Sequence, residues 1–412
     1  MAAVKPFRCI HPANGREEQI AALPYDVYSR EEARNAVEGK PLSFLNIDRP
    51  ETMFAPEQDM YTPEVYEAAA NRLQQMRTEG SFVQEKMPVY YLYELTMDGR
   101  SQTGIVACAS VDDYLNKVIK KHENTREEKE QDRIRHVDVC SAQTGPIFLA
   151  YRSCEVLRKL TAEVKATEPE FAFISEDGIG HRGWKISDPE EVQQIEQAFS
   201  KIDSIYIADG HHRAASAVKV GLKRRAEHPD YDGTEEFNYF LSVLFPDEEL
   251  LIMDYNRVVK DLNGLSEAEF LAKVSEKFET RKLTQQTKPA EKGQMTMYLH
   301  GSWYLLKARD AYKKADPVEA LDVSFLQREL LGPVLGIGDP RIDDRIDFIG
   351  GIRGLSELER RAESDCEVAF AMYPTSIQEL FEVADAGLLM PPKSTWFEPK
   401  LRSGLFIHEI EK

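Results

Sequence analysis

The stretch "SIYIADGHHRAASA", Ser204–Ala217, decides the fold because it marks the passage from a strand to a helix. Its first residues are mostly apolar and predict a buried strand, and Asp209-Gly210 is typical of a turn that ends a strand. The small residues after Arg213 predict a slim helix that packs closely. The first turn of a helix has unpaired N–H groups and a partial positive charge. The junction therefore predicts a site for an anion such as phosphate.

Each polar residue at this junction has a role in such a site. Gly210 lets a ligand approach the backbone closely, and Arg213 can hold a phosphate through two parallel N–H bonds. His211 and His212 add hydrogen-bond donors, and Asp209 can position a metal ion or an attacking hydroxyl. The alternative is a capped turn with a solvated first helical turn. A metal site on the histidine pair is less favoured, since adjacent helical residues point in different directions.

The pattern of the whole chain favours an α+β fold. Helix and strand patterns alternate, and antiparallel hairpins are expected around Asp98-Gly99 and over "FAFISEDGIGHRGWKIS". Thr62-Pro63 is a typical helix start, with Gly80 just past the helix end. A helix is also expected from Asp112 through "YLNKVIKKHENT", followed by a second, highly charged helix. Hairpins mixed with helices favour α+β over a doubly wound parallel sheet.

The length of 412 residues suggests two or three domains. We expect an N-terminal α/β part at 1–110 and a phosphate-binding core at 111–260. A C-terminal α/β part at 261–412 is expected to contribute to the same pocket.

The charge and the cysteines restrict the partners and the compartment. The formal net charge is −19, and an acidic surface repels nucleic acid and anionic lipid, so neither is expected as a partner. Five cysteines without a C-x-x-C pair indicate reduced thiols. The N-terminus carries no secretory signal pattern, and the most apolar run, at 237–246, is too short to span a bilayer. A cytoplasmic protein is expected.

The central segment is similar to a known phosphate-binding motif. "DGHHR" at a strand-to-helix junction resembles the ParB/sulfiredoxin superfamily, in which a Gly-x-x-Arg helix start binds nucleotide phosphates, and most closely its free-serine kinases. This resemblance implies a ParB/sulfiredoxin-like core, with ATP or ADP as the nucleotide and Mg²⁺ carried by it. The whole chain resembles the family catalogued as domain of unknown function 1015. The segments that carry this second resemblance are "LPYDVYSREEA" (23–33), "SFLNIDRPE" (43–51), "HENT" (122–125), "TGPIFLAY" (144–151), "IADGHHRAASA" (207–217), "NRVVKDLNG" (256–264), "IDFIGGIRG" (346–354) and "MPPKSTWFEPKLRSGLF" (390–406).

The segment "HENT" contains a second group of candidates. Glu123 is a candidate general base, because a carboxylate within hydrogen-bond reach can take the proton of an attacking hydroxyl. Asn124 and Thr125 are candidate nucleotide ligands, since ParB proteins bind nucleotide and metal with a Glu-Asn pair. That pair lies after the phosphate motif in ParB proteins and before it here. The alternative is a helix end at this point with Thr125 as the next N-cap. With Glu123, the catalytic candidates are Asp209 and His211.

Cationic residues elsewhere are candidate substrate ligands. Arg49 is a substrate clamp or a loop anchor, and Arg353 lies in "GGIRG", whose glycines expose backbone N–H groups. The proline-braced segment near the C-terminus adds phosphate- or carboxylate-binding side chains at Lys393, Ser394, Thr395 and Lys400. No direct metal-binding motif is present.

Together these features predict a nucleotide-dependent phosphotransferase that acts on a small hydroxylated metabolite. Phosphoryl transfer needs positioning and charge neutralisation, and the chain offers both. Free serine is the first candidate acceptor, through the resemblance to the serine kinases. The alternatives are a phosphatase acting on phosphoserine or a similar ester, and a non-catalytic nucleotide-binding regulator. The expected partner is a small phosphorylated ligand, and a homodimer is left open.

Overall fold

The computed structural model describes residues 1–410 and divides into two compact units. Unit 1 combines residues 1–250 with the segment that begins at Pro399, and unit 2 is Leu251–Glu398. This differs from the expected boundaries near 110 and 260, because strands from both sides of residue 110 hydrogen bond in one sheet.

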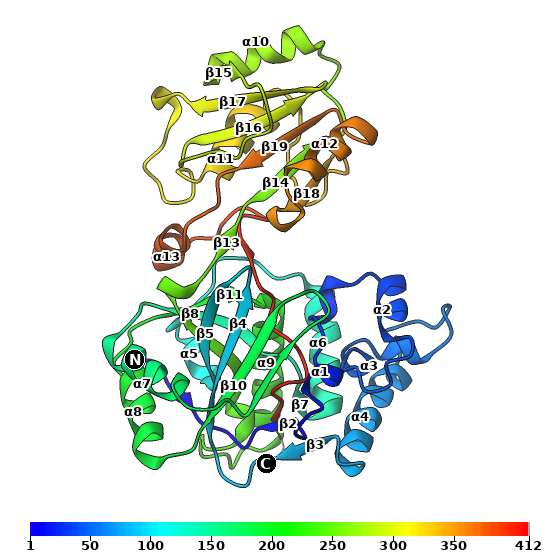
Figure 1. Ribbon diagram of the computed structural model, residues 1–412, viewed down its shortest axis with the longest axis vertical. Coiled ribbons are helices and arrows are strands. Elements are labelled where there is room, and N and C mark those ends of the chain that lie inside the picture. The colour runs from blue at the N-terminus through cyan, green and yellow to red at the C-terminus, as the bar shows by residue number, and fades with distance from the viewer. Residues whose placement is uncertain (411–412) are drawn as a thin grey trace. The chain divides into compact units, whose positions relative to one another are not determined.

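Unit 1 is built on a nine-stranded sheet of order β6-β11-β8-β12-β5-β4-β10-β9, with β1 paired to β5 (Figure 1). Only two neighbouring pairs are parallel, β6 with β11 and β8 with β12, and the others are antiparallel. The expected α+β class is therefore confirmed. The strands are β1 (Val4–Lys5), β4 (Tyr90–Met97), β5 (Arg100–Ser110), β6 (Ile119–Lys120), β8 (Ile147–Tyr151), β9 (Phe171–Ile174), β10 (Gly180–Ile186), β11 (Ile205–Asp209) and β12 (Tyr239–Pro246).

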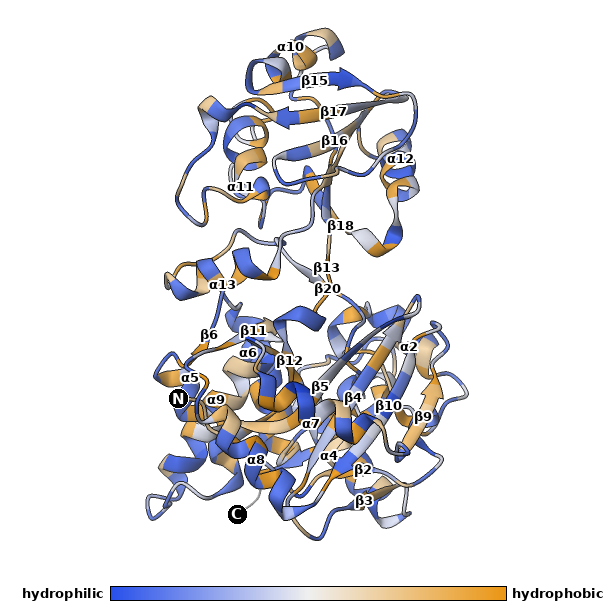
Figure 2. Cartoon of the chain, turned by 60° about the vertical axis from the view of Figure 1, so that its left-hand side comes forward, coloured by the Kyte–Doolittle hydropathy of each residue, from blue (hydrophilic) through white to orange (hydrophobic). Residues whose placement is uncertain are grey.

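The two largest hydrophobic clusters described in unit 1 join its sheet and its helices. The larger joins sheet residues to the apolar faces of α7, α8 and α9, and the smaller joins α2, α3 and α4 to Phe82 and Ile407. Figure 2 shows hydrophobic and hydrophilic colours alternating along α7 and α8, as expected of amphipathic surface helices. The helices are α1 (Glu17–Ile20), α2 (Arg30–Val37), α3 (Leu45–Asp48), α4 (Pro63–Thr78), α5 (Val111–Leu115), α6 (Glu127–Cys140), α7 (Glu155–Lys165), α8 (Pro189–Phe199) and α9 (His211–Glu227), with 3-10 turns η1 (Tyr25–Val27), η2 (Pro50–Met53), η3 (Glu236–Asn238) and η4 (Asp247–Glu249).

The C-terminal segment returns to unit 1 and is buried there. Strand β21 (His408–Glu409) pairs with β7 (Ala142–Gln143), while β2 (Ile10–Pro12) pairs with β3 (Phe82–Gln84). Ile407 exchanges two backbone hydrogen bonds with Ile10, and Phe406 is fully buried against Tyr91 and Tyr93. The segment is thus part of the core of unit 1.

The prediction of a helix over residues 112–125 is wrong. The chain forms only the short α5, which ends where Lys117 adopts a left-handed φ of 61°. Ile119 and Lys120 then pair in parallel with Ile205 and Tyr206 of β11. This tertiary pairing overrides the local helical pattern, and it moves His122 and Glu123 from a helix end to a loop at the edge of the sheet.

Unit 2 is an antiparallel sheet of order β15-β17-β16-β19-β14-β18 with helices packed on it. Its strands are β14 (Tyr255–Val259), β15 (Phe278–Lys282), β16 (Gln294–Leu299), β17 (Ser302–Ala308), β18 (Ile346–Gly350) and β19 (Val368–Met372), with the separate pair β13 (Ile252–Met253) and β20 (Trp396–Phe397). Its helices are α10 (Glu267–Lys277), α11 (Asp322–Leu326), α12 (Leu355–Ser364) and α13 (Ile377–Asp385), with a π turn at η6 (Gln327–Leu331) and 3-10 turns η5 (Asp310–Tyr312) and η7 (Gly351–Arg353). Within residues 1–410, the helices are all too short or too polar to cross a bilayer.

Candidate functional site

The candidate site lies where two loops leave the same edge of the sheet of unit 1. Strands β6 and β11 are parallel neighbours, so their carboxyl ends point the same way. The loop after β6 carries His122 and Glu123, and the loop after β11 carries Gly210 and leads into α9. Loops beyond the carboxyl ends of adjacent parallel strands are a common position for ligand sites in α/β proteins. Residues about ninety positions apart in sequence therefore meet here.

The N-terminus of α9 is open to an anion. The helix has no side-chain cap hydrogen bond, and its first intrahelical bond runs from the Ala214 N–H to the Gly210 carbonyl. The N–H groups of residues 211–213 therefore have no acceptor inside the helix. Among the α-helices of residues 1–410, α9 alone lacks an acidic residue in its first turn. No acidic side chain of the helix itself therefore offsets its positive end.

Asp209 is held by two partners at the end of β11. One carboxylate oxygen, Oδ1, accepts the Gly210 N–H at 2.7 Å, and the other, Oδ2, accepts from Lys400 Nζ at 2.9 Å. Burial would raise the pKa of Asp209, but Lys400 and Arg213 outweigh it and hold this pKa well below the usual range. The side chain is 32% exposed, so Asp209 is an ionised carboxylate at an accessible position.

Arg213 lies beneath the glycine turn. Gly210 has a φ of 92°, and a Cβ there would lie 3.1–3.2 Å from the Arg213 guanidinium. Arg213 Nη1 donates to the Pro146 carbonyl at 2.6 Å, whereas its buried Nε has no partner. The cavity beside Arg213 has a volume of about 30 Å³, which holds roughly one water molecule.

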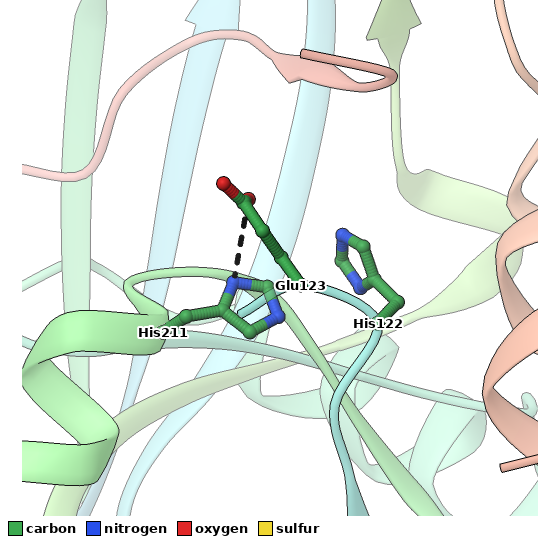
Figure 3. A group of neighbouring side chains, drawn as sticks. All are labelled: His122, Glu123 and His211. Carbon is green, nitrogen blue, oxygen red and sulfur yellow. Dashed lines mark ion pairs between the residues drawn. The ribbon is translucent and has the colours of Figure 1, made fainter. Parts of the chain in front are cut away.

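His122, Glu123 and His211 form a compact group that we call the His–Glu cluster (Figure 3). One donor atom from each side chain lies within 4.8 Å of the other two. His211 Nδ1 lies 4.0 Å from Glu123 Oε2, and the two imidazole rings meet edge to face with centroids 4.5 Å apart. The histidines are buried, at 2% and 6% exposure, and the Glu123 side chain is 45% exposed.

Both histidines of the cluster are neutral at physiological pH. Burial lowers the pKa of His122 to about 4, despite the hydrogen bond to Ile207 and the charge of Asp209. Burial and the neighbouring His122 hold the pKa of His211 well below its usual value. Neutral imidazoles keep a lone pair on one ring nitrogen, so they can accept a proton or bind a metal ion.

The other residues expected around the phosphate have structural partners. His212 Nε2 accepts the Arg126 N–H at 2.9 Å, which orients this ring toward the start of α6. The Thr125 hydroxyl donates to Glu130, and Asn124 is exposed in the same loop. The structure thus brings Asp209, Gly210 and Arg213 together with Glu123 and His211, and it uses His212 and Thr125 to fix the loop before α6.

Arg49 is a loop anchor rather than a free clamp. Its Nη1 donates to the carbonyls of Tyr25 and Tyr28 at 3.0 and 2.7 Å, and its Nε donates to Glu51 at 2.6 Å. The guanidinium is buried at 7% exposure. Of the two sequence interpretations, the anchoring role is the one that these bonds support.

Four of the six expected substrate residues belong to unit 2, and Lys400 belongs to unit 1 with Arg49. Arg353 is exposed in η7, and Lys393 Nζ lies 5.6 Å from the ring centroid of Tyr255. The Ser394 hydroxyl donates a hydrogen bond to the Pro391 carbonyl at 2.6 Å, and Thr395 is half-buried. Lys400 is therefore the expected substrate residue that the structure brings to α9.

The donor set of the His–Glu cluster does not suit Mg²⁺, so the cluster is no site for the Mg²⁺ that the nucleotide is expected to carry. Mg²⁺ prefers oxygen ligands in octahedral geometry, whereas two of the three donors here are imidazole nitrogens. The nearby Asp209 carboxylate is already paired with Lys400. The cluster is the one such group of histidine, cysteine and carboxylate side chains among residues 1–410.

Solved structures with partial likeness include nucleotide complexes. A free serine kinase in complex with AMP is 15% identical, with a TM-score of 0.37, over 73% of this chain and 91% of that one. A conserved hypothetical protein from Pyrococcus furiosus is 14% identical, with a TM-score of 0.34, over 72% and 93%. C-terminally truncated SbnI from Staphylococcus aureus is 12% identical, with a TM-score of 0.38, over 71% and 82%. Curated proteins gave no match.

One family model matches most of the chain. It spans residues 4–324, which include the whole described site except Lys400, and its description reads "Protein of unknown function (DUF1015)". The segments from "LPYDVYSREEA" to "NRVVKDLNG" that suggested this family all fall inside the match. The chain thus belongs to the DUF1015 family.

Proposed function

We propose that unit 1 is a nucleotide-dependent phosphotransferase that binds a phosphate group at the N-terminus of α9. The observation that carries this proposal is the uncapped start of α9, whose free N–H groups lie beside Lys400 and the His–Glu cluster. A helix N-terminus with cations nearby is a ready anion site. Buried polar atoms without partners, on Arg213 and His211, support a ligand at this point.

In this proposal the residues at and near the junction have separate roles in binding phosphate, neutralising charge and accepting a proton. The N–H groups of residues 211–213 and the Arg213 guanidinium hold the phosphate, and Lys400 neutralises charge as the phosphoryl group moves. A bond forms between the acceptor hydroxyl oxygen and phosphorus while the bond to the departing nucleotide breaks. The hydroxyl proton passes to the carboxylate of Glu123, the candidate general base and the exposed member of the His–Glu cluster. Mg²⁺ carried by the nucleotide would add to the charge neutralisation at the phosphates, and no step is routed through it.

The resemblance of "DGHHR" to the free-serine kinases makes free serine the first candidate acceptor, with ATP or ADP as the donor and a ParB/sulfiredoxin-like core. The five cysteines are unpaired thiols, which supports a cytoplasmic location. Arg353, Lys393 and Thr395 stay candidates for substrate contacts within unit 2.

A ³¹P NMR assay tests the proposal on the full chain. With ATP or ADP and serine, we expect a phosphoserine signal that grows with time. Phosphate release from phosphoserine without nucleotide would instead identify a phosphatase, and nucleotide binding without turnover would identify a regulator. Glu123→Gln should retain binding and lose turnover. Its matched control is Glu127→Gln, which changes a 71% exposed carboxylate near the same loop and should behave as the wild type.

Calorimetry with ADP and phosphoserine tests the phosphate site itself. Arg213→Ala should weaken both ligands at least about tenfold, since a hydrogen bond to a charged group contributes about 1.5–3 kcal/mol. Equal binding by Arg213→Ala and the wild type would refute the placement of the phosphate at α9.

A further inference from the structure

Two ring nitrogens of the His–Glu cluster make no hydrogen bond in the protein. His122 Nδ1 and His211 Nε2 are both buried atoms without a partner in the protein. Buried polar nitrogens normally make hydrogen bonds, and an exception calls for an explanation such as an ion. The two rings do not hydrogen bond to each other, and they meet edge to face at 89° with centroids 4.5 Å apart (Figure 3).

The outer contact of His122 resembles that of a metal-binding histidine. The His122 ring hydrogen bonds to the backbone of Ile207, and since Nδ1 is the unpartnered nitrogen, the donor is Nε2–H. Metal-ligating histidines usually donate their second ring N–H to a carbonyl or carboxylate in this way. The bond fixes the tautomer of His122 and leaves its Nδ1 lone pair directed into the cluster.

The geometry points to a binding site for one divalent first-row transition metal ion, such as Zn²⁺, Co²⁺ or Mn²⁺, with His122, Glu123 and His211 as ligands. Two atoms bound to one ion at about 2.0–2.2 Å in tetrahedral geometry lie about 3.3–3.6 Å apart. The three donor atoms lie within 4.8 Å of one another, so closing the site takes a shift of up to about an ångström for each side chain. Glu123 is half-exposed and can make most of this movement.

The ligand set also defines the kind of site. Two imidazoles and one carboxylate favour transition metals over Mg²⁺ and Ca²⁺. Three protein ligands leave at least one coordination position open, as in catalytic rather than structural metal sites. His211 is also the first residue of α9, so the open position is close to the end of the helix that attracts anions. The metal site stands on these three side chains and does not rest on the proposed phosphotransferase activity.

A different use of the same residues would need no metal. In that case Glu123 would only orient His211, as carboxylates orient the histidine base in hydrolases. This arrangement leaves the buried Nδ1 of His122 unexplained, and it predicts no metal affinity at the cluster.

Cobalt titration of the full chain, after dialysis against a chelator, distinguishes the metal site from the metal-free arrangement. We expect one Co²⁺ per chain, with the visible absorption of nitrogen-ligated cobalt, displaced by Zn²⁺ and not by an equal concentration of Mg²⁺. Glu123→Gln should weaken Co²⁺ binding by more than about 100-fold, because loss of an outer-shell partner alone costs about 10–100-fold. His122→Asn should weaken Co²⁺ binding to the same extent. If His122→Asn misfolds because His122 is buried, the Glu123→Gln variant still provides the test.

The matched control is His228→Gln, which removes an imidazole at the opposite end of α9. It should bind Co²⁺ as tightly as the wild type. The inference is overturned if the wild-type chain shows no nitrogen-ligated cobalt band, or if Glu123→Gln binds Co²⁺ with unchanged affinity. Neither result would bear on phosphate binding at α9, which the calorimetry of Arg213→Ala measures separately.

Discussion

Replacing Gly210 by alanine should damage the phosphate site more than it damages the fold. Gly210 has a φ of 92°, and a residue with a side chain in the left-handed region costs about 1–2 kcal/mol. The added Cβ would also lie 3.1–3.2 Å from the Arg213 guanidinium, so the guanidinium must shift. Because that group is the far end of a flexible side chain, the shift costs little stability, but it moves a proposed phosphate ligand.

Gly233→Ala is a matched control for this substitution. Gly233 has a φ of 95° in a loop of unit 1, and its added Cβ would have no neighbour within 4 Å. Both variants should lose about 1–2 kcal/mol of unfolding free energy, measured by urea denaturation. Only Gly210→Ala should also lose affinity for ADP and phosphoserine, by about 10-fold or more, if one charged hydrogen bond of about 1.5–3 kcal/mol is lost. Wild-type affinity in Gly210→Ala would refute the assignment of Arg213 to the phosphate.

Two further predictions concern buried charge in unit 1. Burial and the neighbouring Arg402 lower the pKa of His181 to about 3, so between pH 6.5 and 3 the unfolded chain binds a proton at this position that the folded chain does not. The contribution of His181 to the free energy of unfolding should therefore be complete above pH 6.5 and fall by about 1.4 kcal/mol per pH unit below it. In urea unfolding, the free energy of His181→Gln should decline with falling pH less steeply than that of the wild type, by about this slope. Parallel curves for the two proteins would contradict the reasoning. Arg49→Met should lose about 3–5 kcal/mol of unfolding free energy, because it leaves the buried Glu51 carboxylate unpaired. Arg158→Met, which breaks an exposed ion pair, should show no measurable loss in the same denaturation experiment.

Local sequence signals predicted the helices and turns that are determined by residues adjacent in the sequence. The helix α4 begins at Pro63 as the Thr62-Pro63 signal indicates, and the hairpin of β4 and β5 turns at Asp98-Gly99. Strand β6 was missed, because it is two residues long and exists through its parallel pairing with β11. Non-local pairing of this kind leaves no periodic pattern in the sequence.

The candidate site was predicted only in part, because some of its residues meet through the same non-local pairing. Asp209, Gly210 and Arg213 are recognisable from one contiguous junction, and Glu123 was suggested by its chemistry. His122 was not singled out, since its role depends on the loop after β6 reaching His211. The available signal was the short β-branched run at Val118-Ile119, which ends three residues before His122 and repeats the strand-then-polar pattern of β11.

The interruption of unit 1 by unit 2 has a consequence for biosynthesis. A ribosome adds Lys400, Phe406 and His408 only after it has made all of residues 251–398. Until then the nascent unit 1 lacks β21, part of its core and the cation that pairs with Asp209. Unit 2 can therefore fold before the unit that precedes it is finished, which reverses the usual N-to-C order of folding during translation. The sheet edge at β7 must be protected from wrong pairing in the meantime.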